Sequence, residues 1–391
     1  MPFASALSVA YDPREAVPAV CSELRSQLGN QQPDLVFLFL TRHHAPAAKE
    51  IARDVCERLQ ARHVLGCTAE AIVGVGREVE EGPGISLWGA ILPEAQLRSF
   101  HTEFEKTSDG LVCAGWPDSA EDENMPTAAI VLGDPFSCPV DALIDRLADE
   151  YPGLPLIGGM ASGGRQPGEN SLIYNGELVS QGAVGVLLSG GMQVRSVVSQ
   201  GCRQLGSPFV ITRAQQNVIF ELGGVPALQR FQELYGELDE SDRQLVRQGV
   251  HLGIVMNEYQ DSFSRGDFLI SNVIGVDQES GAIAIGNVVR TGQTVQFHVR
   301  DAGTADEDLR QMLEASVVDS APAQAALLFS CNGRGTRMFP EPHHDASAVQ
   351  EICGSLPIAG FFAQGELGPV GDKNYIHGYT ASMALFGDQA G

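Results

Sequence analysis

The sequence contains one short phrase three times, and this repetition constrains the fold more than any other feature. Apolar runs precede the copies at 35–40, 128–132 and 325–330, and each run is followed by a segment with helical spacing. A further apolar run follows each copy, at 85–92, 183–188 and 375–386. Each copy therefore predicts a strand, a loop, a helix, a strand, a bend and one more strand. The three copies read His63-Val-Leu-Gly-Cys-Thr-Ala-Glu70, Leu154-Pro-Leu-Ile-Gly-Gly-Met-Ala-Ser-Gly163 and Leu356-Pro-Ile-Ala-Gly-Phe-Phe-Ala-Gln-Gly-Glu366.

Three copies with irregular spacing do not suit an open solenoid, so we expect a closed globule built from related halves. Crossover helices require parallel neighbouring strands, whereas the segments 268–276 and 282–285, joined by a turn at Asp277, form an antiparallel hairpin. The predicted fold class is α/β, with mixed sheets, outer helices and four layers in the order α, β, β, α. We place a domain boundary near Leu222, which gives an N-terminal domain 1–222 and a C-terminal domain 223–391.

The segments between these runs predict further elements. Helical spacing is present at 12–28, 46–59, 140–149 and 306–314, and strands are expected at 96–104, 190–201 and 294–299. The acidic, proline-bearing stretch 116–126 is typical of a linker. Acidic clusters at 118–123 and 237–242 are typical of solvated loops and helix ends.

Composition excludes several classes of function. The chain has 391 residues, of which 43% are hydrophobic, and its longest apolar runs are too short to cross a bilayer. A formal net charge of −24 disfavours nucleic acid and anionic membrane surfaces as partners. The N-terminus lacks the basic and apolar regions of a secretion signal, so we expect a cytoplasmic protein. Its eight cysteines include no close pair, and we expect them to be reduced and structural, with no cofactor.

Six segments together resemble the FIST proteins, a family with an N-terminal and a C-terminal FIST domain. The resemblance covers nearly the whole chain, with the segments in the expected order. It implies a sensory or signal-transduction module that binds small ligands such as amino acids. No kinase, methyl-acceptor or F-box segment accompanies the two domains here, so an output partner is expected to be a separate chain. The segments are Asp134-Pro-Phe-Ser, Gly158-Gly-Met-Ala-Ser-Gly163, Phe268-Leu-Ile, Phe297-His-Val-Arg-Asp301, Ser330-Cys-Asn-Gly-Arg-Gly335 and Gly360-Phe-Phe followed by Gly365-Glu-Leu-Gly-Pro369.

The predicted ligand site is the loop that follows the strand 325–330, because α/β sheets bind small molecules at the carboxyl ends of their strands. Arg334 can pair with a carboxylate through two hydrogen bonds, and Asn332 can donate and accept. Gly333 and Gly335 can form an anion-binding nest. An amino acid or another carboxylate fits this chemistry. The alternative is a tight turn in which Arg334 pairs internally with Glu366 or Asp301.

Three further residues complete the predicted set. Glu366 can face the same cleft and receive a ligand ammonium, although a structural ion pair with Arg334 explains it equally. Phe361 in the third copy and His377 on the last strand are added as lining residues. A lone histidine on a strand, such as His377, is more often a core or rim residue. Arg300 and Asp301 are adjacent in the sequence, and we interpret them first as an ion pair that caps the following helix.

Two other classes of function stay open. Cys331 can act as the nucleophile of an enzyme with His343, His344 or His377 as base, because backbone N–H groups and Arg334 can stabilise a thiolate. The other class is a protein-interaction scaffold, which predicts an exposed apolar patch. We expect no metal site, because the adjacent histidines of the pairs at 43–44 and 343–344 point apart.

The glycine-rich bends of the first two copies, at 66–68 and 158–162, are the counterparts of 360–364. They can contribute to a ligand cleft between the domains, which is a common place for ligands. Close approach of one backbone to another also requires glycine, and we favour that explanation for these two bends.

Overall fold

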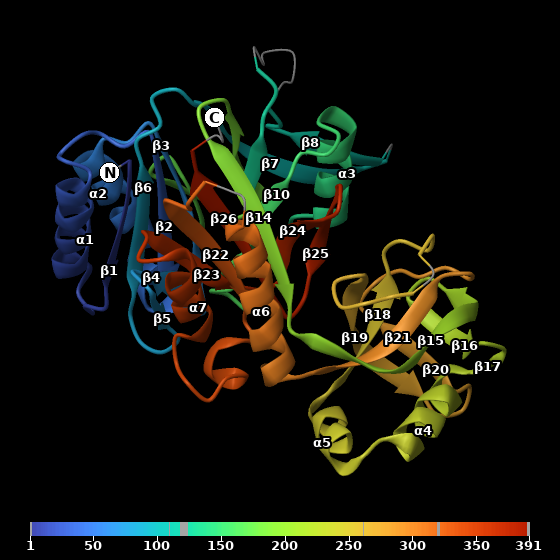
Figure 1. Cartoon of the computed structure of the whole chain (residues 1–391). Coiled ribbons are helices and arrows are strands. Elements are labelled where there is room, and N and C mark those ends of the chain that lie inside the picture. The colour runs from blue at the N-terminus through green and yellow to red at the C-terminus, as the bar shows by residue number, and fades with distance from the viewer. Residues whose placement is uncertain (1, 109, 118–123, 261, 319–320, 389–391) are drawn as a thin grey trace. The chain divides into compact units, whose positions relative to one another are not determined.

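The computed structural model describes residues 2–108, 110–117, 124–260, 262–318 and 321–388 (Figure 1). The chain forms two compact units. Unit 1 contains the described residues of Met1–Val198, Leu309–Ile376 and Thr380–Gly391, and unit 2 contains those of Ser199–Asp308 and His377–Tyr379. These units combine segments that are separate in the sequence, whereas the predicted domains are two continuous stretches that meet near Leu222. That boundary stays a prediction.

Unit 1 is built around three mixed sheets, which confirms the predicted α/β class. In order across each sheet, the first is β1 (Phe3–Ser8), β6 (Ile85–Ala90), β2 (Leu35–Thr41), β3 (His63–Ala69), β11 (Leu172–Tyr174) and β12 (Glu177–Val179). The second is β25 (Lys373–His377), β24 (Glu366–Val370), β10 (Leu156–Met160), β9 (Ala128–Gly133), β13 (Ala183–Ser189), β7 (Gln96–Thr107) and β8 (Gly110–Ala114). The third is β14 (Gln193–Gln200), β26 (Thr380–Gly387), β22 (Ala325–Cys331), β23 (Ile358–Ala363), β4 (Ile72–Gly74) and β5 (Arg77–Val79).

The three copies of the repeat exchange hairpins in a cycle. Each copy contributes two parallel strands to its own sheet: β2 with β3, β9 with β10, and β22 with β23. The short hairpin that follows then joins the sheet of another copy. Strands β4 and β5 of the first copy extend the third sheet, β11 and β12 of the second extend the first, and β24 and β25 of the third extend the second. The bends predicted at the glycine-rich ends of the phrases are wrong for most of these positions, because residues 66–68, 158–160 and 360–363 lie within β3, β10 and β23. The hairpins come after these strands and connect the three copies.

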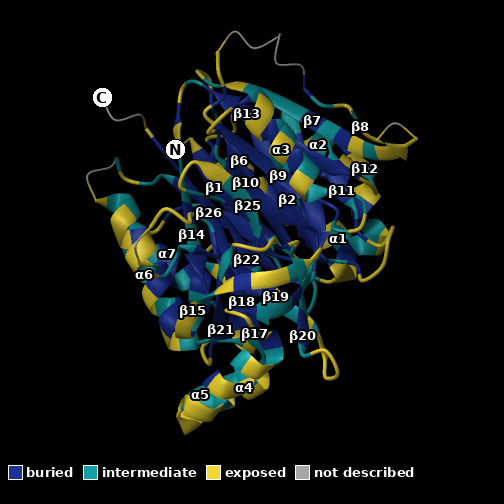
Figure 2. Ribbon diagram, turned by 90° about the vertical axis from the view of Figure 1, so that its right-hand side faces the viewer, coloured by how far each residue is buried: buried dark blue, intermediate teal, exposed yellow. Residues whose placement is uncertain are grey.

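Helices cover the outer faces of these sheets. Helices α1 (Pro13–Gln27) and α2 (Ala48–Leu59) pack on the first sheet, α3 (Val140–Glu150) packs on the second, and α7 (His344–Cys353) and the later part of α6 (Ala302–Val317) pack on the third. The inner faces of all three sheets share one core, to which Phe37, Ile130 and Phe329 belong. Figure 2 shows this pattern as buried strands beside helices that carry exposed positions. The predicted order of helix, sheet, sheet and helix is thus present, with three sheets around the common core.

One glycine in each copy lets two parallel strands approach. A Cβ atom on Gly66 or Gly158 would lie 1.9 Å from the carbonyl oxygen of Leu38 or Val131, and on Gly360 it would lie 1.7 Å from that of Leu328. These residues are paired in register on the neighbouring strand. The close-packing explanation for the glycines of the first two copies is therefore confirmed.

In its described residues, unit 2 contains a ring of antiparallel strands, two complete helices and the first part of α6. The order is β15 (Cys202–Gln215), β21 (Thr294–Arg300), β18 (Val250–Val255), β19 (Phe268–Asp277), β20 (Ala282–Ile285), β16 (Val218–Leu222) and β17 (Val225–Pro226). Strand β15 pairs with both β21 and β16, so the order closes on itself. The helices are α4 (Ala227–Glu237) and α5 (Glu240–Gln248). The predicted hairpin is confirmed as β19 and β20, and its turn ends at Gly281 with a φ of 68°.

Two predicted elements have different limits. The run 375–386 was predicted as one strand, and this is wrong because the backbone turns at Gly378 and Tyr379, where Tyr379 has a φ of 64°. The helix predicted from residue 46 begins at Ala48, since Pro46 lies in a 3-10 turn, η1 (Arg42–Ala47). The acidic cluster 118–123 lies outside the described residues. In the described part of the chain, no helix combines the length and the apolar character needed to cross a membrane.

Candidate functional site

The predicted loop leaves the end of β22, at the carboxyl edge of a parallel pair. Strand β22 ends at Cys331, and the short 3-10 turn η3 (Gly335–Arg337) follows. Gly335 has a φ of 59°, and a Cβ atom there would lie 2.6 Å from a carboxylate oxygen of Glu80. Glycine is therefore required at this position both for the backbone conformation and for the approach of Glu80.

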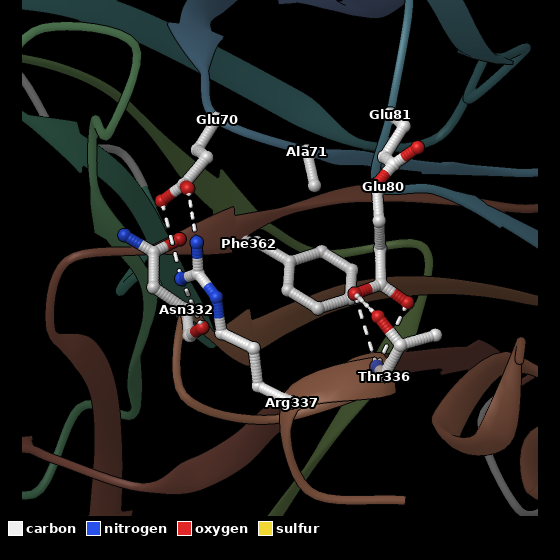
Figure 3. A pocket seen from close by; sticks show the side chains of 8 residues that line it. All are labelled: Glu70, Ala71, Glu80, Glu81, Asn332, Thr336, Arg337 and Phe362. Carbon is white, nitrogen blue, oxygen red and sulfur yellow. Dashed lines mark hydrogen bonds and ion pairs between the residues drawn. The ribbon is translucent and has the colours of Figure 1, made fainter. Parts of the chain in front are cut away.

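A pocket of about 200 Å³ lies beside this loop, inside unit 1. Figure 3 shows the side chains that line it, which come from the ends of β3 and β5, from the loop after β22 and from β23. The first and third copies of the repeat thus meet here. The lining residues are Glu70, Ala71, Glu80, Glu81, Asn332, Thr336, Arg337 and Phe362.

Hydrogen bonds hold two of the pocket carboxylates in place. The Nη2 atom of Arg337 donates to a carboxylate oxygen of Glu70 at 2.5 Å. Its Nη1 atom donates to the backbone carbonyl oxygen of Asn332 at 2.8 Å. Glu80 accepts the backbone N–H of Thr336 at 3.0 Å and its hydroxyl at 2.7 Å. The hydrogen bond with Glu70 raises the pKa of Arg337, which therefore stays cationic. Glu80 occupies a backbone N–H of the loop where an anionic ligand was expected.

Acceptors outnumber donors in this lining. Three carboxylates face one guanidinium, which leaves an excess of negative charge. Glu81 is exposed, whereas the side-chain oxygen of Asn332 is buried without a hydrogen-bond donor among the described residues. A buried carbonyl oxygen without a donor is unfavourable, so a ligand that donates hydrogen bonds is stabilised at this wall.

Arg334 is not among the residues that line the pocket. Its Nε and Nη2 atoms donate to the two oxygens of Asp345 at 2.7 and 2.8 Å, and both side chains are buried. Ser330 and His344 also bond to Asp345, at 2.6 and 2.9 Å. Burial alone would raise the pKa of Asp345, but the charge and hydrogen bonds of Arg334 outweigh it and hold that pKa well below its usual range. The internal partner of Arg334 is thus Asp345, rather than Glu366 or Asp301.

A second buried carboxyl lies close to this ion pair. Glu78 accepts the backbone N–H of Ala346 at 2.9 Å, in the first turn of α7. Burial and the neighbouring charge of Asp345 raise the pKa of Glu78 to about 8. This shift favours the neutral form of Glu78, which limits the negative charge buried in this region.

Glu366 is buried at the start of β24 and does not line the pocket. It accepts the hydroxyl of Thr380 at 2.7 Å and the backbone N–H of Thr380 at 3.2 Å. Burial raises its pKa to about 8, although hydrogen bonds from Thr380 and Cys331 oppose the shift. A carboxyl that keeps its proton at neutral pH cannot accept the proton of the Cys331 thiol, so this contact does not activate Cys331.

The other predicted residues are dispersed. Phe361 lies in the shared core of unit 1, and His377, at the end of β25, belongs to unit 2. His343 accepts the backbone N–H of Glu78 at 3.0 Å. Of the predicted ligand set, Asn332 lines the pocket and Gly335 admits Glu80 to its edge. Among the described residues, no three or more His, Cys, Asp or Glu side chains are grouped so that they could hold a metal ion.

The sequence did not predict the acidic wall of the pocket, which consists of Glu70, Glu80 and Glu81. It also indicated Arg334 as a site residue, whereas Arg337 lines the pocket. Glu70 ends the first copy of the repeat, and Glu80 and Glu81 follow it closely, but all three are far in sequence from the loop at 331–335. The usable signal was the repeat itself, because the end of the first copy is equivalent to the end of the third. Arg337 lies three residues beyond Arg334, and the loop sequence alone does not reveal which of the two is buried.

Comparisons with known proteins identify relatives along nearly the whole chain. The FIST N domain model matches residues 34–225, and the FIST C domain model matches residues 227–369. The chain is 40% identical to Uncharacterized protein Rv0628c of Mycobacterium tuberculosis over 98% of both chains. It is 39% identical to Uncharacterized protein Mb0898c of Mycobacterium bovis over 96% of both.

Proposed function

The chain belongs to the FIST family, whose domains are associated with sensory and signal-transduction roles, and on that premise we propose that it binds a small zwitterion such as an amino acid in the pocket beside the 331–335 loop. One observation carries the proposal. The residues that line the pocket offer mainly acceptors and one cationic side chain, and they include the side-chain oxygen of Asn332, which has no donor among the described residues.

The acidic wall selects the positive end of the ligand. An ammonium group offers three donors and no acceptor, so it matches carboxylates and a carbonyl oxygen at once. Glu81 and the oxygen of Asn332 are the proposed contacts, with Glu80 held beside them by Thr336. A ligand with only negative groups would meet an excess of negative charge, which makes dicarboxylates and nucleotides poor candidates.

Arg337 selects the negative end. Its guanidinium is exposed at the pocket edge and is paired with Glu70. A ligand carboxylate that shares or replaces Glu70 at Arg337 would form the charge-assisted hydrogen bonds for which guanidinium groups are suited. This exchange changes the partner of Glu70, which directly follows β3, and gives the bound state a different arrangement at the junction of two repeats.

The sensory role in this proposal requires a separate output protein. We further propose that the chain acts in the cytoplasm and that the partner responds to the altered pocket edge. A nucleophilic role for Cys331 is not favoured, since two of the bases considered for it have other partners: His343 accepts the backbone N–H of Glu78, and His344 bonds to Asp345.

A thermal-shift screen tests the proposal. The compounds are the amino acids, their decarboxylated amines, dicarboxylates and nucleotides. A ligand at 100 times its dissociation constant stabilises the folded state by about 2.7 kcal/mol. We expect amino acids alone to raise the melting temperature, and Arg337→Gln to abolish the shift. The matched control is Arg77→Gln, which removes an exposed arginine of β5 that does not line the pocket. Stabilisation by dicarboxylates or nucleotides alone would contradict the proposal.

A further inference from the structure

A row of polar side chains crosses four strands on one face of unit 2. Paired positions on neighbouring strands share a face, and the pairing connects β15, β21, β18 and β19 in this order. The adjacent positions of β15, β21 and β18 point to the opposite face and form the main core of this unit, with Leu205, Phe297 and Leu252 among them. The polar row consists of Gln204, His298, His251 and Asn272.

The two histidines of this row are deeply buried, with exposed fractions of 5% for His251 and 2% for His298. The Nδ1 atom of His298 lies 3.0 Å from the carbonyl oxygen of Gln296. A carbonyl oxygen only accepts, so Nδ1 carries the proton and Nε2 keeps its lone pair. No described residue makes a hydrogen bond of good geometry to either ring nitrogen of His251, although Asn272 lies close enough to affect the pKa of this ring. His251 thus has acceptor capacity that hydrogen bonds of good geometry leave unused.

Both histidines are neutral at physiological pH. The pKa of each ring is lowered to about 4, mainly by burial; for His251 the charge of Arg300 contributes to this shift and a hydrogen bond with Asn272 opposes it. Each ring therefore offers one nitrogen lone pair to a donor. Gly253 keeps the space for His298 open, because a Cβ atom there would lie 2.4 Å from the Cε1 atom of that ring.

Arg300 and Tyr379 lie over the same row. The Tyr379 ring centre lies 4.5 Å from that of His251, and the Arg300 guanidinium lies 4.8 Å from the Tyr379 ring centre. The Tyr379 hydroxyl donates to the side-chain oxygen of Asn272 at 2.8 Å. Tyr379 adopts the left-handed backbone conformation, which is rare for a bulky side chain and is found at functional sites. The cluster reaches the surface, since Arg300 and Tyr379 are half-buried and Asn272 is exposed.

We propose that His251, His298, Arg300 and Tyr379 form a second binding site, for a small oxyanion that keeps an O–H group at neutral pH, such as hydrogen phosphate. A guanidinium pairs with the charged oxygens of an oxyanion, and a neutral imidazole accepts the O–H. Sulfate has a similar size and shape and two negative charges, but it has no O–H at this pH. The arrangement therefore discriminates between two otherwise similar anions.

Titration of the full-length protein with inorganic phosphate and with sulfate at the same ionic strength tests this site. The readouts are calorimetry and the NMR signals of the histidine rings. We expect phosphate to bind at least about tenfold more tightly than sulfate, because sulfate cannot supply the hydrogen bond to the imidazole. Only phosphate should shift the signals of His251 and His298. Equal affinities, or no shift of either ring with phosphate, would overturn the proposal.

Variants locate the binding. Arg300→Gln should weaken phosphate binding by about tenfold or more, because a charged hydrogen-bond partner is lost. Arg290→Gln removes an exposed arginine of the same unit and should leave the affinity unchanged. Arg337→Gln should also have no effect, which separates this site from the pocket of unit 1. If Arg300→Gln fails to fold, the comparison of phosphate with sulfate on the unaltered protein decides the question.

Discussion

Arg334 and Asp345 form a bidentate ion pair, with distances of 2.7 and 2.8 Å and with both side chains buried. Asp345 lies in the first turn of α7, so the pair connects the loop after β22 to the helix that follows it. The guanidinium also lies 5.2 Å from the ring centre of Phe339. The loop beside the pocket is therefore held from inside the protein, while Arg337 at its other end faces solvent.

Loss of one partner of this pair should destabilise the protein strongly. Asp345→Asn removes the charge and leaves the guanidinium of Arg334 buried without a counter-ion, which costs about 3–5 kcal/mol. Urea unfolding of the variant and the parent protein measures the difference. Asp54→Asn, which breaks an exposed ion pair with Arg58, is the control and should have a far smaller effect. Equal effects of the two substitutions would show that Asp345 is not a structural anchor.

The repeat glycines should not tolerate a side chain. In Gly158→Ala the new Cβ atom would meet the carbonyl oxygen of Val131, and the paired strands would have to separate. We expect a loss of roughly 3 kcal/mol or more, as for other severe backbone and packing conflicts. Gly236→Ala in α4 meets nothing within 4 Å and should be neutral or stabilising by about 0.5–1 kcal/mol. Thermal unfolding of both variants measures the contrast, and a mild effect of Gly158→Ala would refute the close approach.

Glu366 should make the protein less stable as the pH rises. Its pKa is about 8 in the folded protein, above the ordinary value of 4.5, so the folded state binds the extra proton between these values. Its contribution is fully present below about pH 4.5 and is lost as the pH rises through 8. Glu366→Gln keeps an acceptor for Thr380 and has no proton to lose. The free energy of unfolding of the parent, relative to this variant, should therefore fall between pH 5 and pH 9, and a parallel pair of pH profiles would contradict the assignment.

The sequence predicted the local elements well because apolar periodicity reports directly on burial. The helices at 12–28 and 140–149 and the hairpin after Asp277 are confirmed with small changes in their limits. The cyclic exchange of hairpins was not predictable in the same way. Strands β4, β5, β11 and β12 have three residues each, which is too short for a clear alternation, and their partners are far away in sequence.

The candidate pocket lies beside the loop that was predicted as the ligand site, but Arg337 lines it and Arg334 is paired internally with Asp345. Arg334 and Arg337 carry the same side chain and lie three positions apart, so the sequence does not distinguish their roles. Their environments differ because Asp345 is a buried counter-ion for Arg334, whereas Glu70 is a half-buried counter-ion for the exposed Arg337. That distinction depends on the fold, since Glu70 comes from a different copy of the repeat.

The pocket proposal is tested most directly by calorimetric titration of one amino acid, the most stabilising one from the thermal-shift screen, and of its methyl ester. Both are titrated into the parent protein and into Arg337→Gln. The reference is the affinity of the free amino acid for the parent protein. If Arg337 binds the ligand carboxylate, the ester should bind the parent more weakly than this by a factor of about ten or more. The free amino acid should bind Arg337→Gln more weakly by a similar factor. If the ester and the free amino acid bind the parent equally, or if Arg337→Gln binds as tightly as the parent, the proposed zwitterion site is contradicted.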